Sequence, residues 1–202
     1  MNSKIKRINI NDQEYPSLLR IIPNPPRNLF VKGNFLPNNN CFAIVGARNY
    51  TQKGKEKTQQ ITKKLSKRFT IVSGLASGID TITHSSTLKE KERTFAVLPA
   101  GINQIYPQKN KRLANQIIKN NGCLISEYSP QTKLSKKQFL ERNRITAGLS
   151  SAILAVNARK RSGTSSTIRK ALKQKKKVFT IDSDSFPNTI KIKNTKDILK
   201  NL

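Results

Sequence analysis

The stretch SGLASGID, Ser73–Asp80, joins two segments of different character through small residues and glycines. The residues before it, from Thr70 to Ser73, are typical of a short buried strand, and the residues after it, through His84 and Leu88, follow a helical pattern. A glycine turn between a buried strand and a helix is typical of a βαβ unit. The stretch therefore indicates a parallel sheet.

The same alternation repeats along most of the chain. Strands are predicted at Cys41–Val45, Thr70–Ser73, Thr94–Leu98, Cys123–Ser126, Ala152–Val156 and Lys177–Ile181. Helices are predicted from about Lys53, through His84, over Lys111–Lys119, over Lys137–Leu149 and up to Gln174. Short connections of this kind cross over right-handed and place helices on both faces. We expect an α/β fold with a Rossmann-like, doubly wound, mainly parallel sheet.

Composition shifts at both ends suggest how the chain is organised. Three prolines after Ile22 exclude a continuous helix there, so residues 1–38 are predicted to form an N-terminal extension packed on the core. Residues 39–182 form the predicted main domain. Residues 183–202 are predicted to be a short tail, with one strand and half a helix and without a winged helix.

Several classes of protein are not expected from this sequence. It holds no run of about 18 apolar residues, and its N-terminus lacks the apolar region of a signal peptide. We therefore expect a cytoplasmic protein with no membrane partner. The two cysteines, Cys41 and Cys123, are far apart, and the chain has one histidine, so neither a metal site nor a cofactor is predicted.

The charge of the chain points to a polyanionic partner. Its 39 lysines and arginines against 11 acidic residues give a formal charge of +28 across 202 residues. Residues 142–181 alone carry 11 basic side chains and no acidic one, whereas a solvated helix face normally mixes both signs. A genome biased toward lysine, asparagine and isoleucine codons would also scatter lysines, so charge alone does not settle the function.

Four glycine turns should meet at one edge of the predicted sheet. The turns contain Gly46, Gly74, Gly101 and Gly163, and each lies beyond the end of a predicted strand. Small residues there let a ligand approach the backbone, while helix N-termini aim free N–H groups at the same space. Hydroxyl groups near two of the turns strengthen the prediction of a phosphate-binding pocket; they belong to Ser73, Ser77, Ser162, Thr164, Ser165 and Ser166.

The stretch FLERNRITAGLS, residues 139–150, supplies guanidinium groups and an aromatic ring. Arg142 and Arg144 lie about 200° apart around a helix, so one can face the pocket while the other pairs with a carboxylate, Glu127 or Asp80. Arg48 would reach the pocket from the first glycine turn, and the ring of Phe139 is suited to stacking on a base.

Several motifs follow one another along the chain. They are the pattern Tyr15-Pro16 to Gly33, IVGARNYTQKG (44–54), IVSGLASGIDTITH (71–84), VLPAGINQIYPQKN (97–110), GCLISEYSP (122–130) and FLERNRITAGLSSAILAVNARKRSGT (139–164). In this order they resemble the DprA/Smf family of bacterial DNA-processing proteins, and the resemblance runs from about Tyr15 to Ile181.

The resemblance implies a domain that binds single-stranded DNA, usually as a homodimer, and hands it to the RecA recombinase during natural transformation or recombination. It also implies which residues contact DNA, although Ser77 stands where the family usually has arginine. Taken with the glycine turns, the candidate DNA-binding residues are Arg48, Ser73, Gly74, Ser77, Gly78, Lys136, Lys137, Phe139, Arg142, Asn143, Arg144, Ser162, Gly163 and Thr164.

An enzyme of the same Rossmann-like superfamily, a nucleoside-monophosphate phosphoribohydrolase, is the alternative. Such enzymes use a P-G-G-x-G-T-x-x-E loop, but the matching SGTSSTIRK of this chain (162–170) has no acid at the required position. Acid–base work needs a positioned carboxylate or histidine, and the candidates are Asp80, His84 and Glu127. We expect structural or pairing roles for all three and no catalytic residue.

Overall fold

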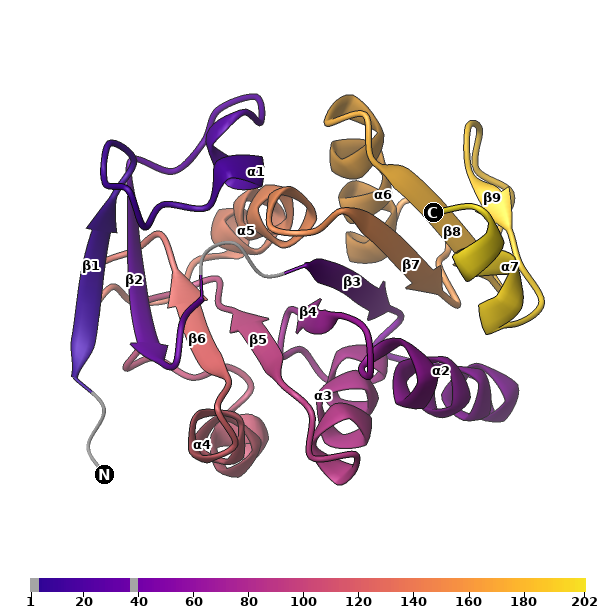
Figure 1. Cartoon of the computed structure of the whole chain (residues 1–202), viewed down its shortest axis with the longest axis horizontal. Coiled ribbons are helices and arrows are strands. Elements are labelled where there is room, and N and C mark those ends of the chain that lie inside the picture. Colours follow the sequence, from indigo (N-terminus) through magenta and orange to yellow (C-terminus); the bar gives the residue numbers. More distant parts are fainter. Residues whose placement is uncertain (1–3, 37–39) are drawn as a thin grey trace.

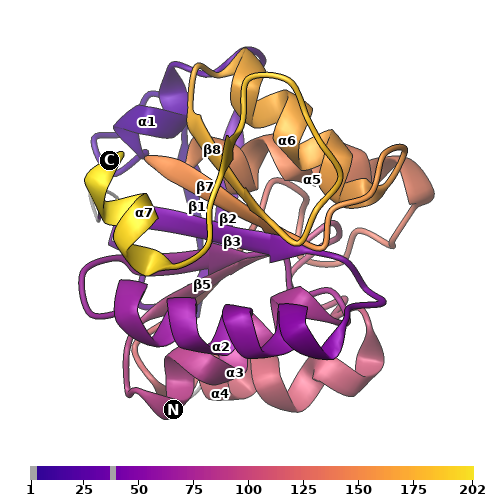
Figure 2. The ribbon, with the colours of Figure 1, turned by 90° about the vertical axis from the view of Figure 1, so that its right-hand side faces the viewer.

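The computed structural model describes residues 4–36 and 40–202 and shows a sheet between two layers of helices (Figures 1 and 2). Within the described residues, nine strands form one sheet in the order β1-β2-β6-β5-β4-β3-β7-β8-β9. From β6 to β9 in this order, each strand pairs in parallel with the next. This architecture confirms the predicted Rossmann-like, mainly parallel sheet.

The six predicted strands are all present, with bounds that differ by at most one residue. They are β3 (Cys41–Gly46), β4 (Thr70–Ser73), β5 (Thr94–Val97), β6 (Cys123–Ser126), β7 (Ala152–Val156) and β8 (Lys177–Ile181). From β3 the chain first builds outward through β4, β5 and β6, and then returns to add β7 on the other side of β3. The strand order therefore reverses between β3 and β7, and the loops after these two strands diverge.

Helices cover both faces of the sheet (Figure 2). One face carries α2 (Gln52–Leu65), α3 (Ile79–Lys89) and α4 (Lys111–Lys119), and the other carries α1 (Ser17–Arg20), α5 (Lys136–Gly148) and α6 (Gly163–Lys173). A single 3-10 turn, Gln108–Asn110, precedes α4. Helices α5 and α6 pack side by side. Because each of these helices follows a strand of the parallel sheet, the first turn of each lies at the carboxyl edge of the strands.

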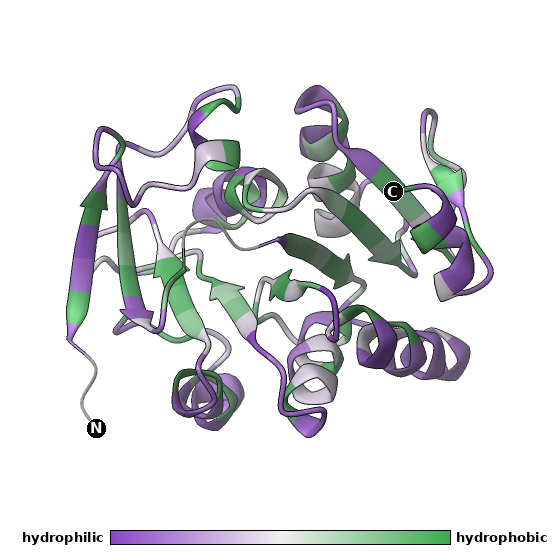
Figure 3. Cartoon of the chain, in the orientation of Figure 1, coloured by the Kyte–Doolittle hydropathy of each residue, from purple (hydrophilic) through white to green (hydrophobic). Residues whose placement is uncertain are grey.

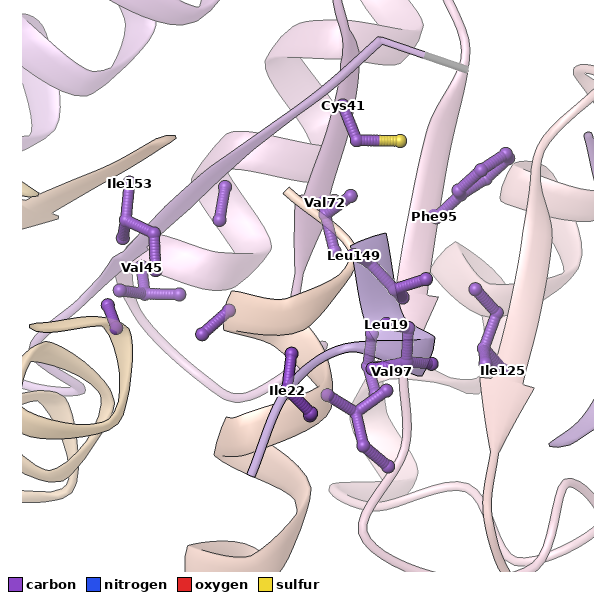
Figure 4. Packing of buried hydrophobic residues seen from close by; sticks show 14 of the residues in the cluster. Leu19, Ile22, Cys41, Val45, Val72, Phe95, Val97, Ile125, Leu149 and Ile153 are labelled. Carbon is purple, nitrogen blue, oxygen red and sulfur yellow. The ribbon is translucent and has the colours of Figure 1, made fainter. Parts of the chain in front are cut away.

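The core follows from the alternation of side chains along each strand. In β3, Phe42 and Ile44 join the cluster under α2 and α3, while Ala43 and Val45 join the cluster under α5 and α6. Because both faces are covered, the central strands are mostly apolar, as Figure 3 shows. Figure 4 shows one of these clusters, in which Leu19 from α1 packs among residues of the central strands.

The ends of the chain add strands to both edges of the sheet. The sequence predicted a packed N-terminal extension and placed no strand in it. The extension contains β1 (Ile5–Asn9) and β2 (Asn28–Gly33), which pair antiparallel with each other and, through β2, with β6. The tail adds β9 (Ile190–Lys191) and α7 (Thr195–Lys200), as predicted. The expected boundary between residues 38 and 39 lies outside the described residues.

No helix within residues 4–36 and 40–202 has the length and apolarity that crossing a bilayer requires.

Candidate functional site

A pocket of about 540 Å³ opens at the carboxyl edge of the sheet where the loops after β3 and β7 diverge. Open α/β sheets bind their ligands at such a point, because the diverging loops leave a crevice. We call it the switch-point pocket. Its lining includes Val45, Gly46, Ala47, Arg48, Asn49, Gly74, Ala76, Asp80, Phe139, Leu140, Arg142, Asn143, Thr146, Asn157, Arg159, Ser162, Gly163, Thr164 and Thr167.

The floor of the pocket is organised around Arg142 of α5, whose side chain is buried. Its Nη1 donates to the carbonyl oxygens of Gly74, at 2.6 Å, and Val97, at 2.5 Å, and its Nε donates to Asn143 Oδ1 at 3.2 Å. Gly74 is required here because a Cβ atom would lie 2.2 Å from Nη1 of Arg142. The guanidinium group thus joins α5 to the ends of β4 and β5.

Asp80 lies in the first turn of α3 and is also buried. Its Oδ2 accepts a hydrogen bond from the backbone N–H of Ala76 at 3.3 Å. Burial raises the pKa of Asp80, and the charge of Arg142 opposes that rise. Burial likewise lowers the pKa of Arg142, against the effect of Asp80. The two charges therefore stabilise each other inside the floor.

The rim of the pocket carries exposed cations and aromatic rings. The guanidinium carbon of Arg48 lies 5.3 Å from the centroid of the Phe139 ring, within cation–π range. Tyr106 meets the same ring edge-on at 5.5 Å between centroids and is 43% exposed. Across the pocket, Arg159 is exposed and its Nη1 donates to Asp184 Oδ1 at 3.0 Å. Cations on two sides therefore flank an aromatic surface.

The N-terminus of α6 forms another wall. Ser162 caps the helix: its Oγ accepts from the N–H of Ser165 at 3.1 Å and donates to the carbonyl of Arg159 at 2.6 Å. The amides of Gly163 and Thr164 precede the first bond within the helix and lie at its positive end. Among the described residues outside its own helix turn, none would touch a Cβ atom placed on Gly163, so the space on that side of its Cα is open.

Several predicted DNA-binding residues do not line the pocket. Ser73 is buried and donates to the carbonyl of Ile44 at 2.7 Å. Gly78, at φ +85°, packs so closely that a Cβ atom would lie 2.4 Å from the carbonyl oxygen of Ala47. Both residues support the turn from inside the protein, and their contact with DNA stays a prediction. The others outside the lining are Ser77, Lys136, Lys137 and Arg144.

Arg144 points to the other side of α5 from Arg142. Its guanidinium group binds both carboxylate oxygens of Glu127, at 2.8 and 2.6 Å, and its Nε donates to the carbonyl of Asn24 at 2.8 Å. The prediction that one arginine faces the pocket while the other pairs with a carboxylate is confirmed. Arg144 does not line the switch-point pocket, because this ion pair holds its side chain, and its contact with DNA stays a prediction.

Of the three titratable candidates, His84 is the least suited to a catalytic role. It is buried in α3, and its Nδ1 lies 2.8 Å from Thr94 Oγ1. Burial, assisted by the charge of Arg142, lowers the pKa of His84 to about 3. Glu127 is held by Arg144, and Asp80 is held in the floor. All three side chains are therefore engaged in packing or pairing.

Sequence reasoning missed two polar residues that come after β7. Asn157 has a left-handed backbone, with φ +50°; its Oδ1 accepts from the N–H of Thr51 at 3.1 Å and its Nδ2 donates to the carbonyl of Asp182 at 3.0 Å. It ties the start of α2 to the end of β8. Arg159 was noted only as part of a charge run. The sequence did contain a signal for both residues, because polar residues directly after a buried strand lie at the ligand-binding edge of the sheet.

Within the described ranges, no three His, Cys, Asp or Glu side chains lie close enough together to hold a metal ion.

Comparison with known proteins gives a consistent result. Residues 6–201 match the family described as DNA recombination-mediator protein A. The DNA processing protein DprA of Bacillus subtilis (strain 168) is 40% identical over 185 residues, which cover 90% of this chain and 62% of that protein. Protein Smf of Synechocystis sp. is 41% identical over 180 residues, covering 85% of this chain and 44% of that protein. The chain thus spans about half the length of these relatives.

Solved structures agree with the sequence match. DprA of Streptococcus pneumoniae superposes with a TM-score of 0.88 at 31% identity, over 98% of this chain and 75% of that one. DprA of Helicobacter pylori, a structure described in terms of its single-stranded DNA binding mode, gives 0.78 at 29% identity, over 100% and 90%. A molybdenum cofactor binding protein from Rippkaea orientalis shares the fold alone, with 0.59 at 14% identity, over 81% and 95%.

Proposed function

Because this chain belongs to the DNA recombination-mediator protein A family, with relatives named DprA and Smf, we propose that it binds single-stranded DNA in the switch-point pocket. The observation that carries the proposal is the convergence of exposed guanidinium groups, helix N-terminal amides and an aromatic rim on one cavity. The same combination of cations and stacking surfaces serves sequence-tolerant binding of single strands in other folds.

Phosphate groups and bases would use different walls of the pocket. Arg48 and Arg159 supply charge from opposite sides, and the amides of Gly163 and Thr164 offer donors to a phosphate oxygen. Phe139 and the exposed Leu140 present apolar surface to an unstacked base. A duplex keeps its bases stacked inside, so it can offer only phosphates, whereas a single strand can use both walls.

The buried floor would help binding without touching the strand. Arg142 and Asp80 each bind the nearby backbone and attract each other electrostatically, so the floor presents fixed positions to a ligand. Rigid support lowers the ordering cost when the strand binds. We assign Arg142 and Asp80 as positioning residues, and we keep Lys136 and Lys137 as exposed candidates at the start of α5 for a strand that leaves the pocket.

The resemblance to the DprA/Smf family supports further steps of this proposal. We propose that the protein passes the bound strand to the RecA recombinase in natural transformation or recombination, that it acts as a homodimer, and that it works in the cytoplasm, where these partners are found. We propose a binding role without catalysis, because Asp80, His84 and Glu127 are all engaged by other groups. Incubation with AMP tests that point, since release of free base would show an enzyme.

Competition between single- and double-stranded oligonucleotides of equal charge tests the proposed DNA binding. We expect the single strand to displace a fluorescent single-stranded probe at lower concentration, and the affinity to fall with salt by a logarithmic slope of about −0.7 for each phosphate neutralised. The double variant Arg48→Ala/Arg159→Ala should bind the single strand more weakly. Lys64→Ala/Lys67→Ala, at the opposite end of α2, is the matched control. Equal affinity for the single and the double strand would show that the protein binds DNA only as a non-specific polycation.

A further inference from the structure

A second cavity, of about 330 Å³, lies beside α6 and away from the switch-point pocket. One wall is the N-terminal extension at Pro23 and Asn24, and the other is the side of α6. We call this cavity the α6 pocket; its cations are Arg144, Arg169, Lys170 and Lys173. Nothing in the sequence motifs pointed to it, since it needs two parts of the chain far apart in sequence.

The cations of the α6 pocket share one face of the helix. Arg169 and Lys173 are four residues apart and Lys170 and Lys173 are three apart, so their side chains are neighbours. Among the described residues, no acidic side chain lines the cavity. The acids nearby are already occupied: Glu127 binds Arg144 at 2.6 Å, and Glu141 binds Tyr128 at 2.6 Å and Lys137 at 3.4 Å. The pocket therefore holds unbalanced positive charge.

The pKa of Lys170 reflects the positive charge of the α6 pocket. It is half-buried, and burial lowers its pKa, as do the neighbouring charges of Arg144 and Lys173. Its pKa is lowered even though Glu127 and Glu141 act in the opposite direction. An anion in the cavity would stabilise the charged form of Lys170 and offset part of the repulsion among the cations.

Helices α5 and α6 lie between the two pockets and contribute residues to both. Residue 142 of α5 and residue 167 of α6 line the switch-point pocket, while residues 144 and 166 line the α6 pocket. Along α6, Thr164 and Lys173 are about 14 Å apart at 1.5 Å per residue. A flexible strand that leaves the first pocket can reach the second.

We propose that the α6 pocket binds the phosphate backbone of the same single-stranded DNA, one segment beyond the part held in the switch-point pocket. The inference rests on the proposed function and extends the length of strand that the protein covers. Arg169 would bind a phosphate with two N–H groups, and Lys173 would add a flexible point charge beside it. Both side chains are exposed, so they can move toward a ligand.

The test compares strands of two lengths with the double variant Arg169→Ala/Lys173→Ala. Oligothymidylates of about 4 and about 16 nucleotides span the usual range of single-strand sites. We expect the variant to bind the long strand more weakly, with a salt slope reduced in magnitude by about 1.4 for two lost contacts, and to bind the short strand as the unaltered protein does. Lys64→Ala/Lys67→Ala removes the same charge at the far end of α2 and should keep the salt slope.

Three outcomes would overturn the inference. If the two double variants change the slope equally, only net charge matters. If the α6 variant loses short and long strands alike, the α6 pocket is not a separate segment. If it loses polyglutamate but neither DNA, the pocket binds an acidic polypeptide instead. The proposed function is judged separately, because it fails if Arg48→Ala/Arg159→Ala binds the short strand normally or if single and double strands bind equally well. Circular dichroism confirms that each variant is folded.

Discussion

The floor and the rim of the switch-point pocket are both built from charged side chains, but water reaches only the rim. Arg142 and Asp80 of the floor are 6% and 5% exposed, and their polar atoms bind backbone groups of the protein. Arg48 and Arg159 of the rim are exposed, and Arg48 lies over an aromatic ring. Arginine therefore has two separable roles here: in the floor it holds the loops in place, while in the rim it is accessible to a ligand.

Among the substitutions considered, Arg142→Ala should destabilise the protein most, because Arg142 belongs to the buried floor. The substitution leaves the carbonyls of Gly74 and Val97 without their donor and Asp80 without its buried counter-charge. We expect a loss of about 3–5 kcal/mol in the free energy of unfolding, the usual cost of breaking a buried charge pair. Urea unfolding followed by circular dichroism measures it. A stability unchanged from the original protein would show that the floor charges are not needed for folding.

Arg48→Ala should show the opposite behaviour. Its side chain is exposed, so we expect the free energy of unfolding to change by no more than about 0.5 kcal/mol. The affinity for single-stranded DNA should fall by about 1.5–3 kcal/mol, the range for a lost hydrogen bond to a charged group. Fluorescence anisotropy and urea unfolding on the same preparation separate the two quantities. An affinity equal to that of the original protein would move the DNA site away from this rim.

His84 also belongs to the buried polar residues, and the pH dependence of stability tests whether it is buried in its neutral form. Its folded pKa of about 3 lies below the ordinary value of about 6.5, so the unfolded chain takes up the proton first on acidification. The stability is therefore complete above pH 6.5 and is lost as the pH falls toward 3. Between pH 7.5 and 5 we expect a loss of about 2 kcal/mol from this group.

The variant His84→Gln isolates that effect, because the chain has one histidine. Asp80 acts in the opposite direction, since burial raises its pKa and acidification therefore favours its folded state. The difference between the two proteins in urea unfolding, measured at several pH values, removes the contribution of Asp80 and of other carboxyl groups. Parallel stability curves for the two proteins from pH 7.5 to 5 would contradict the burial of a neutral His84.

Ser162 lies between the buried floor and the exposed rim of the switch-point pocket, and we expect only mild changes in stability and DNA affinity from Ser162→Ala. Its hydroxyl group caps α6, so we expect a loss of about 1 kcal/mol in the free energy of unfolding. DNA affinity should change less than in Arg48→Ala, because the amides of Gly163 and Thr164 remain. Parallel measurement of both quantities checks this. A larger loss of affinity than of stability would place the hydroxyl group itself in contact with the strand.

Much of the fold could be predicted because short parallel strands covered on both faces leave a strong pattern. Cys123–Ser126 and Lys177–Ile181, for example, were predicted with their final bounds. The strands of the N-terminal extension were not. Asn28–Gly33 comes soon after three prolines, and its partner strands lie in distant parts of the sequence. Local patterns cannot show such pairing, because it depends on which edge of the sheet is left open.

The site was predicted in outline, and its details depended on directions that sequence does not contain. Helical spacing separates Arg142 from Arg144, but only the fold decides which of them enters the pocket. The loop after β4 was expected to contact the ligand through Ser73 and Gly78, yet both face inward. Asn157 was missed because its role joins Thr51 and Asp182, which are brought together only by the finished sheet.

The two edges of the sheet carry a consequence for self-association. β1 presents the exposed side chains of Lys6 and Arg7, and the opposite edge ends in β9, which is two residues long. A second copy that added its own β1 to this edge would place like charges opposite each other, and β9 is too short to template another strand. Neither edge therefore favours strand-to-strand association into fibres, and the homodimer proposed above would have to meet through helices or loops.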